Sequence, residues 1–271
     1  MDSTPDLPGN HSLDSTALAS GVKRRNAQGR RNGAITLWII GLIALVVASV
    51  IVRFHPAPWP FDLQTTNTLQ QLPHGSWVST ALGWFTTVND PIPSVSSITL
   101  WFVVLLLIGV VAWRRGGSPI PWVVTAIFIW LGTMFMWTLF FLIDFLAARP
   151  RPSAALIHMY VPEPIPTFPS GHVVYAIVYY GFLFYLSLTK PVSQWRYRWL
   201  LIPFQLYAVL NILLIGLSRV YEGSHWLTDV LGGYLMGALL LALLIALYRW
   251  ILARLTTWYE KRQAVKATHN Q

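Results

Sequence analysis

The chain has 271 residues, of which 55% are hydrophobic and only 11% are charged, and its formal net charge is +9. A soluble domain carries about a quarter charged residues, so this composition excludes an ordinary soluble protein and indicates an integral membrane protein. The absence of cysteine excludes a disulfide framework, a thiol nucleophile and a thiolate metal site. Most basic residues lie in tails and short loops, which membrane topology explains better than nucleic-acid binding.

The first segment, residues 1–34, is polar and has no apolar periodicity. We predict a disordered cytoplasmic tail. It contains the basic run "KRRNAQGRR" at 23–31, directly before the first apolar stretch. The run is typical of a topology anchor, and specific binding to acidic lipid is the alternative. A cleavable signal peptide is not indicated, since the apolar stretch is long and no small-residue cleavage site follows it.

Six apolar segments then follow, each close to the roughly 20 residues that cross a bilayer. They must be helical because backbone polar groups cannot stay unpaired in hydrocarbon. We therefore predict an all-α fold, a polytopic membrane protein with a six-transmembrane-helix bundle in a domain spanning 35–254, and a C-terminal tail over 255–271. The six segments cover about 35–53, 96–113, 121–143, 171–189, 199–217 and 227–248.

The distribution of loop charges predicts the orientation. The N-terminal run, the loop "RRGGS" at 114–118, the loop holding Lys190, Arg196 and Arg198, and the C-terminal tail are all basic. By the positive-inside rule they lie on the cytoplasmic side, so both termini are cytoplasmic in a multi-pass protein of the cell membrane. The segment 54–95 is then outside, and two of its stretches have the spacing of amphipathic helices at the interface.

Another outer segment, "SRVYEGSHWLTD" at 218–229, gathers ionisable residues at the mouth of the last apolar helix. His225 and Asp229 are four residues apart and share a helix face. The carboxylate can orient the imidazole, whose free nitrogen then acts as base or nucleophile. Arg219 offers a bidentate donor for a phosphate or carboxylate. The structural alternative is an interfacial histidine beside an Arg–Asp ion pair.

Two further motifs lie on the same predicted side. In "PSGH" at 169–172, Ser170 can cap a helix, Gly171 lets a ligand approach the backbone, and His172 falls in the first turn. Such a helix start suits an anion, although an ordinary cap and an interfacial histidine would look the same. In "RPRP" at 149–152, proline ends the preceding helix, and the arginines either serve this site or snorkel as membrane anchors.

Together these segments could hold a phosphate, attack it and protonate its leaving group. No dense cluster of outer carboxylates is present, so a two-metal phosphatase is not indicated. The pattern favours phosphoryl transfer through a histidine, without a metal or another cofactor.

With these motifs the chain resembles the type 2 phosphatidic acid phosphatase superfamily of membrane lipid phosphatases. The signature motifs of that family are Lys-x6-Arg-Pro, Pro-Ser-Gly-His and Ser-Arg-x5-His-x3-Asp. The second is intact at 169–172 and the third at 218–229, while the Arg-Pro of the first falls at Arg151 and Pro152. The order, the spacing and the six-helix layout match over about residues 35–250.

The resemblance implies a role for each matched residue. His225 would be the nucleophile that forms a phosphohistidine, Asp229 would orient it, and His172 would protonate the leaving group. The phosphoryl oxygens would be bound by Arg151, Ser170, Gly171 and Arg219.

The first motif departs from the family pattern, because its lysine position holds Asp144. A carboxylate facing a phosphate is repulsive at low effective dielectric. We therefore expect Asp144 to pair with Arg149 or Arg151, and Arg149 to be an auxiliary cation in place of the missing lysine. The departure could also weaken or alter the activity.

The resemblance thus predicts hydrolysis of a membrane lipid phosphate or pyrophosphate at the extracytoplasmic face. Candidate substrates are phosphatidic acid, phosphatidylglycerol phosphate and polyprenyl pyrophosphate. The alternatives are a lipid phosphotransferase, in which the phosphohistidine passes its group to an acceptor other than water, and a catalytically weakened lipid-binding or transport homologue. A vanadate-binding, haloperoxidase-like site is a remote further alternative.

Overall fold

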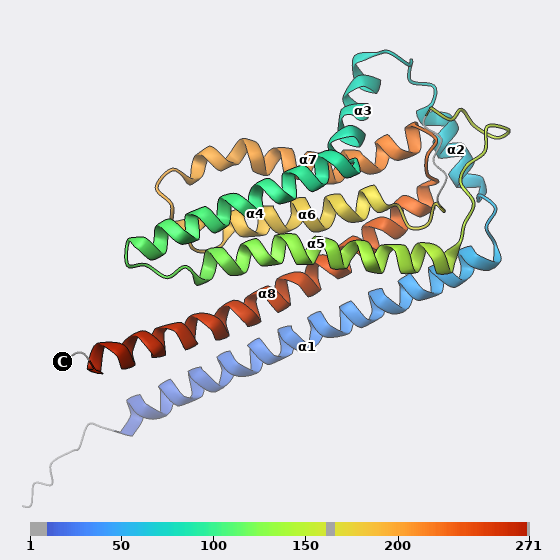
Figure 1. Ribbon diagram of the computed structural model, residues 1–271. Coiled ribbons are helices and arrows are strands. Elements are labelled where there is room, and N and C mark those ends of the chain that lie inside the picture. The colour runs from blue at the N-terminus through green and yellow to red at the C-terminus, as the bar shows by residue number, and fades with distance from the viewer. Residues whose placement is uncertain (1–9, 161–165, 270–271) are drawn as a thin grey trace, which may run out of the picture. The chain divides into compact units, whose positions relative to one another are not determined.

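The computed structural model describes residues 10–160 and 166–269, and this part of the chain forms helices and their connections without a β-strand (Figure 1). The predicted all-α fold class is confirmed for these residues. The chain divides into two compact units, Met1–Ala44 and Leu45–Gln271. The helices are α1 (Asn10–Phe54), α2 (Pro60–Leu69), α3 (Trp77–Asn89), α4 (Pro91–Arg114), α5 (Ile120–Ala147), α6 (Gly171–Leu188), α7 (Ile202–Tyr221) and α8 (Leu227–His269), with short 3₁₀ turns at Val192–Gln194 and Arg198–Leu201.

The predicted number of membrane spans is confirmed by helix length and composition. Among the described residues, six helical stretches are long and apolar enough to cross a membrane. Each coincides with one of the six segments predicted from the sequence. They are Gln28–Phe54, Pro91–Arg114, Ile120–Ala147, Gly171–Leu188, Arg198–Tyr221 and Leu227–Lys266.

The prediction of a disordered N-terminal tail does not hold for residues 10–34, because α1 begins at Asn10. This stretch contains alanine, leucine, arginine and glutamine, which favour helix, and no proline to end it. Residues 1–9 lie outside the described part of the chain. The division into a tail over 1–34, a membrane domain over 35–254 and a tail over 255–271 stays a prediction.

The two predicted helices of the segment 54–95 are present as α2 and α3. Ser76 caps α3 by accepting a hydrogen bond from the backbone N–H of Ser79 at 3.3 Å. On α2, Asp62 and Thr66 are one turn apart and both are fully buried. Because polar side chains are buried on this face, α2 must contact other parts of the unit. Asp62 belongs to the candidate site described below.

Helix α6 forms the centre of the unit Leu45–Gln271. It contacts α5, α7 and α8, and Figure 1 shows it in the middle of the bundle. In its most apolar stretch 72% of the residues are buried within the protein, against 17% for α4. Since α6 carries "PSGH" at its N-terminus, the most enclosed helix also positions one of the three motifs.

A glycine on α8 allows α6 and α8 to approach closely at the level of the motifs. A Cβ on Gly233 would lie 2.9 Å from the carbonyl oxygen of Ser170 and 3.0 Å from Cβ of Val173. Close approach through small residues is how helices associate inside membranes. It brings Ser170 near Asp229, whose carbonyl accepts a hydrogen bond from the Ser170 backbone N–H at 3.0 Å.

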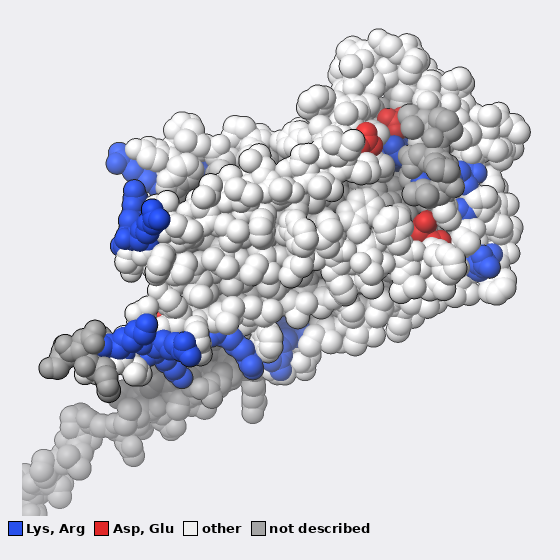
Figure 2. Space-filling view, in the orientation of Figure 1, with Lys and Arg blue, Asp and Glu red and all other residues white. Residues whose placement is uncertain are grey.

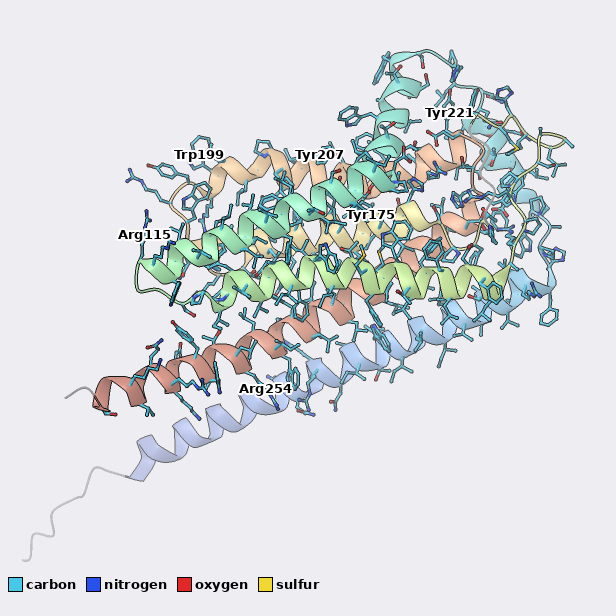
Figure 3. The ribbon with its side chains drawn as sticks, viewed as in Figure 1. Arg115, Tyr175, Trp199, Tyr207, Tyr221 and Arg254 are labelled. Atoms are coloured by element: carbon cyan, nitrogen blue, oxygen red, sulfur yellow. The ribbon has the colours of Figure 1, made fainter. Side chains whose placement is uncertain are left out.

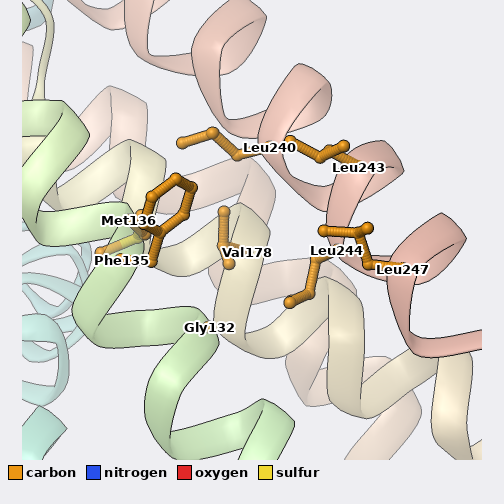
Figure 4. A pocket seen from close by; sticks show the side chains of 8 residues that line it. All are labelled: Gly132, Phe135, Met136, Val178, Leu240, Leu243, Leu244 and Leu247. Atoms are coloured by element: carbon orange, nitrogen blue, oxygen red, sulfur yellow. The ribbon is translucent and has the colours of Figure 1, made fainter. Parts of the chain in front are cut away.

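Farther along the bundle, the space between α5, α6 and α8 is almost filled. A cavity of only about 40 Å³ remains there, and its lining includes Gly132, Val178 and Leu244 (Figure 4). A Cβ on Gly132 would lie 2.6 Å from a methyl carbon of Leu244, so the helices are in close contact. Because its lining side chains are apolar, this cavity has no group that could do chemistry.

The end of α5 predicts a stabilising substitution. Ala148, the C-cap residue, has φ 45° and ψ 38°, a left-handed conformation that costs a residue with a Cβ about 1 kcal/mol. We expect Ala148→Gly to raise the thermal unfolding midpoint in detergent. Ala147, one residue earlier, is helical and buried, so Ala147→Gly should lower it. Equal effects of the two substitutions would contradict the conformational explanation.

Candidate active site

The three motifs meet at one end of the helical bundle. This end is marked by Tyr221 in Figure 3, and the opposite end by Arg115 and Trp199. In the space-filling view, acidic and basic side chains lie together at the first end, whereas the loop after α4 and the loop before α7 show basic ones only (Figure 2). The first end therefore differs in composition from the other, and it contains every predicted site residue.

His225 lies in the short link between α7 and α8 and is 1% exposed. Gly223 has φ 70° in this link, a conformation suited to glycine, and the turn is closed by hydrogen bonds from the N–H groups of Ser224 and His225 to the carbonyl of Arg219. The turn directs the imidazole into the protein instead of toward solvent.

Both imidazole nitrogens of His225 have defined partners. Nδ1 lies 2.9 Å from the carbonyl oxygen of Thr167, and because a carbonyl can only accept, Nδ1 carries the proton. Nε2 lies 3.1 Å from an N–H of Arg151 and accepts from it. The lone pair of the neutral ring therefore points at a guanidinium, which is where a phosphate group would be bound.

Asp229 acts on His225 differently from the prediction. Its Oδ2 is 3.9 Å from Nδ1, too far for a direct hydrogen bond. Instead, the hydroxyl of Thr167 donates to Oδ2 at 2.8 Å, and the same residue's carbonyl accepts from the ring. The carboxylate also accepts the backbone N–H of Trp226 at 2.8 Å. Asp229 thus holds the histidine through Thr167, while its charge remains close to the ring.

The two predicted phosphate-binding arginines border His225. Arg151 donates to the carbonyl of Ser224 at 2.7 Å as well as to the imidazole. Arg219 is 1% exposed and forms an ion pair with Glu222 at 3.0 Å, not with Asp229. Both guanidinium groups are held in place by acceptors near the ring, as a preorganised anion site requires.

Ser170 and Gly171 of "PSGH" do not make the contacts that the sequence predicts. Ser170 occupies the N-cap of α6, but its hydroxyl makes no capping bond, and Oγ is buried without a hydrogen bond to any described residue. A buried hydroxyl of this kind is a natural donor to a bound ligand. For Gly171, a Cβ would lie 2.8 Å from the Phe140 ring, so packing between α5 and α6, not ligand approach, explains this glycine.

His172 faces a carboxylate that the sequence analysis did not single out. Its Nε2 lies 3.1 Å from Oδ1 of Asp90, the N-cap residue of α4. The side chains are 15% and 45% exposed, so this pair is more accessible than His225. The positive form of His172 contributes to lowering the pKa of His225.

The expectations for Arg149 and Asp144 are wrong. Arg149 is fully buried and forms ion pairs with Asp62 and Asp229, so it does not replace the missing lysine. Asp144 is 3% exposed, and no salt bridge within 4.0 Å joins it to Arg149 or Arg151 in the described part of the chain. The charges that act on it are those of Arg151 and Asp229. The partners of Arg149 come from α2 and α8 and not from α5, which carries Asp144.

Three residues of the site escaped the sequence analysis. Thr167 links His225 to Asp229, Asp90 contacts His172, and Asp62 contacts Arg149. A faint signal existed for Asp90, because an aspartate directly before proline is typical of a helix start. Thr167 and Asp62 belong to no local pattern. Among the described residues, no group of three or more histidines and carboxylates could hold a metal ion.

The surroundings of His225 favour its neutral form. Burial, and then the positive charges of Arg151, Arg219 and His172, lower the pKa of the imidazole well below its ordinary value of 6.5. The ring therefore keeps its lone pair on Nε2 even in mildly acidic solution. This is the state that a nucleophilic or basic histidine needs.

The lowered pKa predicts how stability depends on pH. Below pH 6.5 the unfolded chain binds a proton at this histidine that the folded chain does not, so the free energy of unfolding should fall as the pH drops. Above pH 6.5 the effect vanishes. We expect thermal unfolding in detergent to show a steeper loss between pH 6.5 and 5 for the wild type than for His225→Gln. Parallel curves would contradict this assignment.

Comparison with known proteins agrees with the geometry. The family model described as the PAP2 superfamily matches residues 133–253. The match spans less than half of the chain, which therefore resembles this superfamily over that region. It includes "RPRP", "PSGH" and the segment 218–229, and it excludes Asp62 and Asp90.

Two curated relatives resemble part of the chain. An undecaprenyl-diphosphatase of Sulfolobus acidocaldarius is 35% identical over 97 residues, which cover 35% of this chain and 41% of the relative. Phosphatidylglycerophosphatase B of Bacillus subtilis is 36% identical over 98 residues, covering 34% of this chain and 42% of the relative. The matched segments thus span less than half of each relative.

The fold of the chain matches a solved structure. A crystal structure of a transmembrane PAP2-type phosphatidylglycerolphosphate phosphatase from Bacillus subtilis aligns with a TM-score of 0.62 and 19% identity. The alignment covers 79% of this chain and 96% of that one. At this identity the likeness establishes the fold, and with the six apolar helices it identifies a multi-pass membrane protein.

Proposed function

We propose that this protein hydrolyses a phosphate monoester or diphosphate of a membrane lipid through a phosphohistidine at His225. The observation that carries the proposal is the position of Nε2, which has its lone pair directed at Arg151 while Nδ1 is held by Thr167. The similarity to the family model, and to relatives named as an undecaprenyl-diphosphatase and a phosphatidylglycerophosphatase, supports the same reaction.

The proposed reaction has two steps. Nε2 of His225 attacks phosphorus, the bond from phosphorus to the leaving oxygen breaks, and His172 gives that oxygen its proton. Water then attacks phosphorus, returns a proton to His172 and breaks the N–P bond. Arg151, Arg219 and the hydroxyl of Ser170 bind the phosphoryl oxygens, and Asp229 offsets the positive charge on the ring.

The membrane orientation forms part of the proposal. Lys190, Arg196 and Arg198 are exposed in the loop before α7, and Arg114 and Arg115 are exposed after α4. By the positive-inside rule this end is cytoplasmic, so the termini are cytoplasmic and the site is extracytoplasmic. A lipid headgroup of the outer leaflet of the cell membrane would then reach the site.

The test of the function is phosphate release without metal. We expect the protein, purified in detergent with excess chelator, to release phosphate from at least one of phosphatidic acid, phosphatidylglycerol phosphate and polyprenyl diphosphate. Activity that requires an added divalent ion would contradict the metal-independent reaction.

The same assay separates the alternatives. Transfer of labelled phosphate to an added alcohol or lipid, with no release to water, would identify a phosphotransferase. Binding of these lipids without any turnover would identify a homologue that has lost catalysis. In that case Asp144→Lys, which restores the cation of the family motif, would be the next variant to examine.

A further inference from the structure

A buried charge cluster lies directly behind the proposed catalytic residues. The guanidinium of Arg149 bridges two carboxylates, donating to Oδ1 of Asp229 at 2.5 Å and to Oδ2 of Asp62 at 3.2 Å. All three side chains are 0% exposed. With both carboxylates ionised, one cation between two anions leaves the cluster with a net charge of −1.

The cluster joins three distant parts of the chain. Asp62 comes from α2, Arg149 from the loop after α5, and Asp229 from the first turn of α8. Asp62 also accepts the backbone N–H and the hydroxyl of Thr228, both at 2.9 Å, so it caps the N-terminus of α8 from another helix. Arg149 in turn donates to the Thr228 hydroxyl at 2.7 Å.

The charge balance matters for the proposed reaction. The imidazole of His225 becomes positive when its Nε2 bonds to phosphorus, and Asp229, 3.9 Å from Nδ1, is the anion placed to offset that charge. A buried arginine paired with Asp229 alone would cancel most of this effect. With Asp62 present, the positive charge of Arg149 is shared between two carboxylates.

We propose that Asp62 is a positioning residue that compensates the charge of Arg149 and so keeps the negative charge of Asp229 effective at His225. The inference rests on the proposed function. Arg149 correspondingly fixes Asp229 in place without neutralising it.

Three other charged groups from neighbouring elements affect the charge of His225. Arg151 and Arg219 contribute positive charge from the loop after α5 and from α7, and His172 does so from α6. Glu222 is paired with Arg219. None of these residues is altered in the variants below, so differences between variants report on the cluster behind Asp229.

The test is a charge series read from the pH dependence of kcat/KM for phosphate release. Asp62→Asn changes the net charge of the cluster from −1 to 0, Arg149→Gln changes it to −2, and the double variant restores −1. We expect the acidic limb of this profile to move down by about one pH unit in Asp62→Asn and up by a similar amount in Arg149→Gln, and to return to the wild-type position in the double variant. A unit charge about 10 Å from a titrating group has roughly this effect at an effective dielectric of about 20.

A structural anchor would behave differently. If Asp62 only caps α8, each single variant and the double variant should lose stability and activity with the acidic limb unmoved, which would overturn the inference. Thr228→Val is the matched control, since it removes the hydroxyl that bonds to both Asp62 and Arg149 without changing any charge, and it should leave the limb in place. Should one single variant fail to fold, the direction of shift in the other still tests the proposal.

A wild-type protein without phosphate release would overturn the proposed function and this inference with it. An active wild type whose variants keep its pH profile would overturn the inference alone.

Discussion

His225→Ala should reduce phosphate release to the background rate. The substitution removes the atom that is proposed to bond to phosphorus, and losses of a nucleophile are typically about 10⁶-fold in kcat. The measurement is phosphate release at saturating lipid, with the unfolding midpoint confirming that the variant is folded.

A control variant and a trapping measurement complete that experiment. His74 is exposed and stacks on the ring of Tyr160, so His74→Ala is a matched control that should keep wild-type turnover. An acid-labile phosphoryl group that is trapped on the wild-type protein and is absent from His225→Ala would support the covalent intermediate. Wild-type turnover by His225→Ala would rule out this histidine as the nucleophile.

Arg151→Lys should lower kcat/KM by about 10²- to 10³-fold, the usual cost of losing one preorganised donor in an active site. One N–H of Arg151 lies 3.1 Å from Nε2 of His225 and 2.7 Å from the carbonyl of Ser224, so the planar group is held where the phosphoryl oxygens would bind. Lysine keeps the charge but cannot reproduce the bidentate geometry.

The control for this substitution is Arg115→Lys at the opposite end of the bundle, where the arginine is exposed. Its activity should equal that of the wild type. If Arg151→Lys shows the same kcat/KM as Arg115→Lys, Arg151 does not bind the transferring group, and Arg219 would have to supply that contact.

The sequence by itself determined the helical membrane fold. The six apolar segments are long enough to cross a bilayer, and hydrocarbon forces such segments into helices whatever their neighbours are. The gathering of Arg219, His225 and Asp229 was also readable, because they lie within one short segment. These features depend on local composition and spacing, which a single sequence contains.

Only the tertiary structure decided which carboxylate pairs with which cationic side chain. Asp229 is four residues from His225, yet it acts through Thr167 and pairs with Arg149, 80 residues away. Asp62 in α2 and Asp90 at the N-cap of α4 precede the motifs in the chain and are brought to the site by packing.

The reason is physical. In a buried site the partner of a charge is set by distances of a few ångströms and by the removal of water, and neither is encoded in local spacing. Asp144 illustrates this point. Arg149 or Arg151 was its expected partner, whereas Arg149 pairs with Asp62 of α2 and Asp229 of α8 instead.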